Sequence, residues 1–165
     1  MRYLMRKELV SIGDDYWIED EQGRRAFRVD GKVLRLQKTF VLEDPEGAEV
    51  ATIKKRLVAL RETMTIERGG RTVARVRKAF FAPFRQRFDV DAEGGGPELV
   101  IQGNITDHEY DVRREDTTVA EISKRWFGLR DTYAVDVAPG EDAALMIGLT
   151  VAVDWMGHEE HDDDD

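Results

Sequence analysis

The sequence predicts a mostly β protein, a closed antiparallel barrel of about 12 strands around a central hydrophobic C-terminal helix. Three observations lead to this prediction. The run AALMIGLTVAV at 143–153 is apolar on every side. A strand-like motif recurs along the chain, and glycine-containing turns precede most of its copies. Within the strong copies one face is apolar and begins with an alanine.

The C-terminal run predicts a buried helix. A surface helix has polar residues along one side, so a helix that is apolar all round must be buried on every side. The run has eleven residues without a charge, whereas a membrane span needs about 20 apolar residues. We therefore expect a helix over about 141–157 that passes through the middle of the domain and does not span a membrane. Asp142 is placed to cap its N-terminus.

The recurring motif marks the strands. Its three strong copies are EVATIKK at 49–55, TVARVRK at 72–78 and TVAEISK at 118–124. Equivalent residues of successive copies are 23 and then 46 residues apart, which is one and then two repeat lengths. Weaker copies occupy 26–32 and 99–104. If each copy belongs to a strand–turn–strand unit, five units give roughly ten to twelve antiparallel strands.

Turn residues separate these strands. The turns share acidic residues followed by glycine, which supplies the positive φ that tight hairpins need. They lie at 20–23, 44–47, 67–70 and 93–96. Strand-like runs, including 35–42 and 61–66, lie upstream of the turns.

Alternation along the strands indicates which side faces inward. In the strong copies the apolar face begins with Ala51, Ala74 and Ala120, and the opposite face is polar. A small residue at a repeated inward position leaves room for a bulky group, and the apolar helix fits that role. Because so many strands normally curl or close, and closure removes exposed edges, we expect a barrel around the helix.

The composition fits a single cytoplasmic domain with an acidic tail. A chain of 165 residues can bury a sizeable core, and we place the domain at 1–157. The N-terminus has no signal-peptide pattern, which favours a cytoplasmic location. Six of the last seven residues are acidic and account for most of the net charge of −9. We expect 158–165 to be disordered because nothing in it can be buried.

Motifs of known catalytic chemistry are absent from the sequence. It has no glycine-rich nucleotide loop, no Gly-x-Ser-x-Gly and no cysteine. His158 and His161 lack the spacing of a zinc-binding His-Glu-x-x-His motif. We therefore expect a protein that is not an enzyme and that has no cofactor and no metal.

The middle of the chain is basic and supplies the candidate site. Residues 54–87 contain eleven Lys or Arg and two Glu. Alternation places some of these cations on the polar face, whereas three lysines end the repeats at the inward phase, where we expect them to reach solvent at the barrel rim. The candidate anion-binding residues are Lys54, Lys55, Arg56, Arg75, Arg77, Lys78 and Lys124. Nucleic acid is not expected, because no aromatic residues interleave with these cations.

Several longer stretches together resemble the LURP-one-related family, and we expect the chain to be a prokaryotic member. They are VAEISKRWFGLRDTY at 119–133, VDVAPGED at 135–142 before the apolar helix, YWIED at 16–20, VDGK at 29–32 and LEDPEG at 42–47. The resemblance covers about residues 1–157 with motif order and spacing kept. It implies the tubby C-terminal-like fold, a twelve-stranded barrel around a central hydrophobic helix.

More distant similarity to phospholipid scramblases is seen in ISKRWFG at 122–128 and VDWM at 153–156. Scramblases place a calcium-binding acidic segment between these points, but here only Asp131 and Asp136 precede Pro139, which is sparse for calcium.

Tubby-like domains bind phosphoinositide head groups through basic barrel surfaces, so the resemblance implies anionic phospholipid as a ligand. The alternative is a scaffold or protein-interaction barrel that binds an unknown protein and no small ligand.

Overall fold

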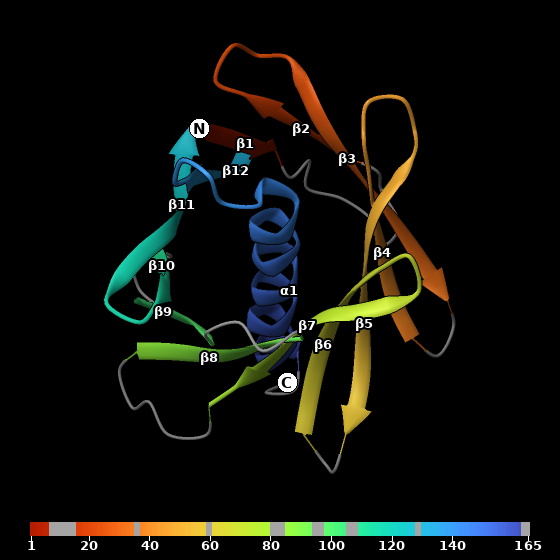
Figure 1. The fold of residues 1–165 in the computed structure, drawn as a ribbon, viewed down its shortest axis with the longest axis vertical. Helices are drawn as coiled ribbons and strands as arrows, with labels where there is room; N and C mark the ends of the chain where they lie inside the picture. Colours follow the sequence, from red (N-terminus) through yellow and green to blue (C-terminus); the bar gives the residue numbers. More distant parts are fainter. Residues whose placement is uncertain are drawn as a thin grey trace.

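The computed structural model describes residues 1–6, 16–34, 37–58, 61–79, 85–93, 98–104, 109–127 and 130–162. These residues form twelve strands and one helix (Figure 1). The strands are β1 (Arg2–Arg6), β2 (Tyr16–Asp20), β3 (Arg25–Leu34), β4 (Gln37–Glu43), β5 (Glu49–Val58), β6 (Arg61–Arg68), β7 (Arg71–Lys78), β8 (Arg85–Ala92), β9 (Leu99–Asn104), β10 (Glu109–Arg114), β11 (Thr117–Phe127) and β12 (Arg130–Val137). The helix is α1 (Ala143–Asp162).

The strands form a closed antiparallel barrel in which each strand pairs with its neighbours in sequence. The first and last strands close the barrel, with Arg2 in register with Asp136. At this seam the Met1 ammonium donates a hydrogen bond to the Val137 carbonyl oxygen over 2.7 Å. The predicted fold class is therefore confirmed, because closure leaves neither end of the sheet unpaired.

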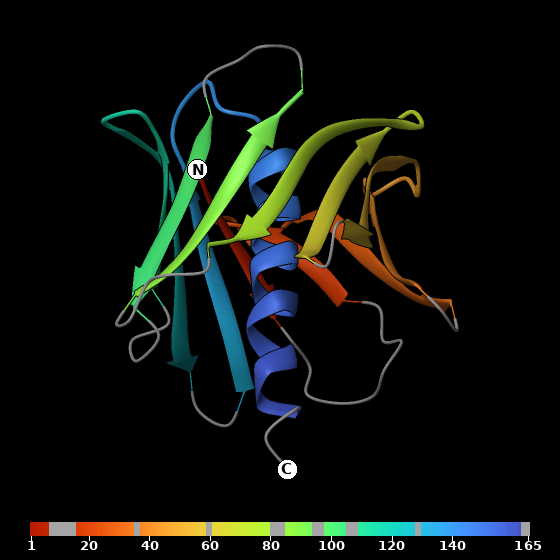
Figure 2. The ribbon, with the colours of Figure 1, turned by 90° about the horizontal axis from the view of Figure 1, so that it is seen from below.

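Helix α1 runs through the middle of the barrel, inside the strands in both views (Figures 1 and 2). Its central residues from Met146 to Val153 are buried. The inward alanines of the repeats, Ala51, Ala74 and Ala120, are buried in the same core. At Gly148 a Cβ would lie 3.3 Å from Ile66 Cδ1 of β6, so helix and barrel wall approach closely there.

The ends of the helix differ from those expected. It begins at Ala143, two residues after 141, and ends at Asp162, five residues after 157. Residues 158–162 were predicted to begin a disordered tail and are helical instead. The prediction used burial as its criterion, but an established helix gains one backbone hydrogen bond for each added residue without needing a buried side. Residues 163–165 of the predicted tail lie outside the described residues.

The predicted turns follow the expected chemistry where they are described. In the β2–β3 and β4–β5 turns, Oδ1 of Asp20 and of Asp44 accepts hydrogen bonds from the backbone N–H groups two and four residues later. Gly23 and Gly47 take φ values of 76° and 88° in these turns. The 93–96 turn lies mostly outside the described residues.

Two arginines bind the acidic residues at the N-terminus of the helix. Asp142 caps α1 as predicted, since its Oδ1 accepts a hydrogen bond from Leu145 N over 3.0 Å. The Arg68 guanidinium at the end of β6 donates to both Asp142 carboxylate oxygens over 2.5 and 2.8 Å. Arg114 at the end of β10 binds both Glu141 oxygens over 2.6 and 2.9 Å. Because of these hydrogen bonds the pKa values of Asp142 and Glu141 lie below their usual range.

Acidification is therefore expected to weaken the barrel. A carboxyl whose pKa is depressed by folding adds stability above its unfolded pKa of about 4 and loses it as pH falls through the folded value. The free energy of unfolding should fall as the pH drops below about 5. A variant with Glu141→Gln and Asp142→Asn should show a flatter dependence on pH in urea titrations, and asparagine keeps the cap. Identical pH profiles for the two proteins would contradict this role of the arginines.

Substitutions at Gly148 test the close approach of the helix to the wall. Alanine gains about 1 kcal/mol in helix propensity, and the flexible end of Ile66 has to move by only a few tenths of an ångström, so Gly148→Ala should be close to neutral. Gly148→Leu should destabilise by about 3 kcal/mol or more through overpacking, measured by urea unfolding. Ala144→Leu, at a half-buried position of the first turn, is the control. Equal stability of the Gly148→Leu and Ala144→Leu variants would rule out close packing at Gly148.

Candidate functional site

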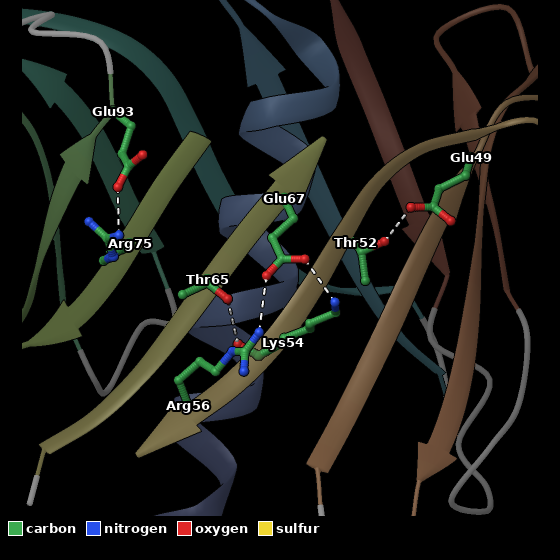
Figure 3. Close-up of polar contacts among 8 residues, drawn as sticks. All are labelled: Glu49, Thr52, Lys54, Arg56, Thr65, Glu67, Arg75 and Glu93. Carbon is green, nitrogen blue, oxygen red and sulfur yellow. Dashed lines mark hydrogen bonds and ion pairs between the residues drawn. The ribbon is translucent and has the colours of Figure 1, made fainter. Parts of the chain in front are cut away.

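The predicted cations of the polar face gather on the outer side of β5, β6 and β7. Their inward neighbours, such as Ile53, Met64 and Val76, are fully buried in the core, so alternation turns the cations outward. In Figure 3 the labelled cations lie in front of the strands and α1 lies behind them. In each of two neighbouring rows a threonine of β6 stands in register between a cation of β5 and a cation of β7. The rows are Lys54–Thr65–Arg75 and Arg56–Thr63–Arg77, and together they are the basic face.

A single carboxylate binds both outward-facing cations of β5. Glu67 of β6 accepts a hydrogen bond from Lys54 Nζ over 2.7 Å and one from Arg56 Nη2 over 3.3 Å (Figure 3). These hydrogen bonds, that from Lys54 above all, hold the pKa of Glu67 below its usual range. The Glu67 side chain is only 13% exposed, so this carboxylate is a fixed part of the surface.

Carboxylates at and just after the end of β8 pair with two of the arginines of β7. Arg75 Nη2 lies 2.5 Å from Glu93 Oε1, and Arg77 forms an ion pair with Asp91. Four cations therefore face three carboxylates, and the described surface here is much less positive than the sequence count for 54–87 indicates. The acids at 91 and 93 lie outside that stretch, and the pairing of β7 with β8 brings them next to the arginines.

The structure describes the side chains of two of the three lysines predicted at the barrel rim. Lys55 Nζ lies 2.9 Å from Glu62 Oε1 of β6, so it forms an ion pair. Lys55 and Lys78 are both half-buried, in keeping with lysines that reach solvent beside the core. The backbone of Lys124 belongs to β11, where it is in register with Tyr133, but its side chain lies outside the described part of the chain. Anion binding by these three lysines stays a prediction.

Sequence reasoning missed the threonines of the basic face. Thr63 and Thr65 point outward, yet they are only 2% and 5% exposed. Their register partners are long cationic side chains, whose stems can cover them. The Thr65 hydroxyl donates a hydrogen bond to the Lys54 carbonyl oxygen over 3.4 Å. The Thr63 hydroxyl oxygen has no hydrogen-bond partner among the described residues. Their phase in the strand-like run 61–66, opposite to Met64, was the available signal.

One carboxylate of the central helix bonds to the barrel wall. Asp154 lies within α1, and Tyr133 of β12 donates a hydrogen bond to its Oδ1 over 2.5 Å. Burial and then the charge of Asp154 raise the pKa of Tyr16 on β2. This polar contact ties the helix to the wall in one rotational position, which gives Asp154 a structural reason for being there.

Metal and membrane features can be examined only for the described ranges. Within them no group of three or more His, Asp or Glu side chains is arranged to hold a metal ion. No helix in the described part of the chain combines the length and the apolar character needed to cross a bilayer.

Comparisons with known proteins agree with the geometry. Residues 1–154 match the model of the family described as LURP-one-related. The uncharacterized protein YxjI of Bacillus subtilis is 23% identical over 160 residues, covering 96% of this chain and 95% of that protein. Protein LURP-one-related 12 of Arabidopsis thaliana is 29% identical over 92% of this chain and 75% of its own length. An X-ray structure of an Arabidopsis thaliana protein shares the fold, with a TM-score of 0.69 and 21% identity over 95% of this chain and 92% of that one. The chain therefore belongs to the LURP-one-related family.

Proposed function

We propose that the protein is a non-enzymatic binding module that recognises anionic phospholipid head groups through the basic face. The observation that supports this most directly is the side-by-side arrangement of four outward cations on β5 and β7, in two rows that flank β6. Their side chains are 29–44% exposed, so a ligand can reach them from solvent. A cytoplasmic location remains part of the proposal.

The energetics favour weak, salt-sensitive binding. Each Lys or Arg near an anionic membrane contributes on the order of 1 kcal/mol. Glu67, Asp91 and Glu93 offset part of this attraction, since they already accept hydrogen bonds from the same cations or pair with them. Ion pairs at a protein surface are worth only about 0–1 kcal/mol each. A phosphate group can therefore replace a carboxylate partner at little cost to the fold.

The chemistry of the face fits binding better than catalysis. A general base works best with a pKa near the working pH, whereas the pKa of Glu67 is lowered by its cationic partners. Each ion pair described on this face instead holds a cation in position. The proposal therefore includes neither a reaction nor a cofactor.

The same ion pairs favour a second candidate function. A surface whose cations are largely matched by carboxylates suits a scaffold barrel that contacts another protein and binds no small ligand. Charge-driven lipid binding weakens steeply between low and physiological ionic strength, because salt screens exposed charges. A protein interface that does not depend on unpaired charge would weaken much less with salt, so salt dependence separates the two functions.

Co-sedimentation with vesicles tests the proposal. The protein should bind vesicles containing phosphatidylglycerol, but not phosphatidylcholine alone, and only at low ionic strength. Arg75→Gln with Arg77→Gln should weaken binding about tenfold, somewhat less than two full membrane contacts would contribute. Arg24→Gln with Arg113→Gln removes the same charge from β2–β3 and β10 and should change binding little. No binding at low salt, or equal losses in both variants, would reject the basic face as the lipid site.

Removing the shared counter-ion should strengthen binding. Glu67→Gln leaves Lys54 and Arg56 without their carboxylate, so affinity for the same phosphatidylglycerol vesicles should rise several-fold. Glu21→Gln, in the β2–β3 turn, makes the same change in net charge and is the control. If both variants gain affinity equally, net charge alone governs binding and Glu67 has no special part in it.

A further inference from the structure

We infer that the Thr63 hydroxyl forms, with Arg56 and Arg77, a subsite for one phosphate group on the basic face. The inference rests on the proposed function and adds to it a defined position and a neutral donor. It concerns the row Arg56–Thr63–Arg77, in which the central residue is not a cation.

The first step is the unusual state of the hydroxyl. Thr63 is 2% exposed, and its Oγ1 has no hydrogen-bond partner in the described part of the chain. Buried hydroxyl groups almost always have a partner, because losing water without a replacement hydrogen bond is costly. An unpartnered hydroxyl just beneath the outer face of a barrel is therefore a donor that a ligand can engage once the covering cationic stems move aside.

The second step is the identity of its neighbours. Arg56 of β5 and Arg77 of β7 are directly in register with Thr63 on either side. Residues opposite one another in an antiparallel pair have Cβ atoms about 5 Å apart, so both side chains start next to the hydroxyl. Their side chains are 42% and 43% exposed.

The third step is donor capacity. An arginine guanidinium has five N–H donors in a planar fork. The described ion pairs engage Arg56 at Nη2 with Glu67 and Arg77 at Nη2 with Asp91, so donors remain on both side chains. A phosphate group has several acceptor oxygens, and arginine binds it well in bidentate geometry. Two guanidinium groups with a hydroxyl between them match a tetrahedral oxyanion.

The neighbouring row provides a matched comparison. Thr65 stands between Lys54 and Arg75 in the same way, but its hydroxyl already donates to the Lys54 carbonyl oxygen. The two threonines share strand, face and burial, and they differ in whether the hydroxyl is engaged. A ligand that uses the free hydroxyl should therefore distinguish between them.

The experiment compares Thr63→Val with Thr65→Val in the full chain. Valine keeps the shape and removes the hydroxyl. Binding is measured to phosphatidylglycerol vesicles by co-sedimentation at low salt, and to inorganic phosphate by NMR shifts of β5–β7 amides. Thr63→Val should weaken binding about tenfold, the loss expected for a hydrogen bond to a charged group, and Thr65→Val should leave it unchanged. The melting temperature of Thr63→Val should be unchanged or higher, since an unsatisfied buried hydroxyl is removed.

The outcomes separate the inference from the proposed function. If the unaltered protein binds vesicles and Thr63→Val binds equally well, the subsite is rejected and the basic face stands. Equal losses in both variants also reject the subsite. If the unaltered protein binds neither vesicles nor phosphate, both ideas fail together. Selective loss for vesicles alone supports the subsite with a lipid head group as its ligand, and selective loss for inorganic phosphate alone supports it with free phosphate.

Discussion

Burial of the apolar helix on every side is the constraint on which the rest of the molecule depends. A helix with no polar stripe cannot rest on one face of a sheet, so the sheet has to surround it. This requires a barrel wide enough to hold a helix, with small inward residues where the two approach. Ala51 and Ala74 on the wall and Gly148 on the helix meet that requirement. The Arg68–Asp142 ion pair and the Tyr133–Asp154 hydrogen bond then hold the helix at the two ends of its buried part.

Surrounding the helix in this way leaves one face of every strand to the outside. Across β5 to β8 that outer face consists of long cations alternating with carboxylates on the next strand, as in the contacts of Glu67 and Glu93 (Figure 3). Cross-strand pairs of opposite charge stabilise a sheet modestly, whereas like charges directly opposite one another destabilise it. Placing the uncharged Thr63 and Thr65 between cations avoids such direct contacts. The basic face is thus a consequence of sheet chemistry as well as a candidate ligand surface.

The fold was predictable from the sequence because its signals are local. Apolar character around the whole helix and alternation along 49–55 or 72–78 can be read within one segment, and each has one physical interpretation. The site was less predictable because ion pairs depend on which strands become neighbours. Asp91 and Glu93 lie outside the basic stretch 54–87 in the sequence. They come close to Arg75 and Arg77 only because β7 pairs with β8. The end of α1 was also misplaced, since backbone hydrogen bonding can extend a helix beyond its buried part.

Stability and recognition are largely separate in this architecture, and this favours a surface role. The core around α1 supplies the apolar burial that drives folding, whereas each exposed ion pair of the basic face adds little. Exchanging the Asp91 carboxylate for a ligand oxyanion would therefore leave the barrel intact. The unpartnered Thr63 hydroxyl fits the same division, because its cost in the unliganded protein is small beside the burial of the helix. A surface whose polar groups are incompletely satisfied can gain from a ligand what it lacks in the folded protein alone.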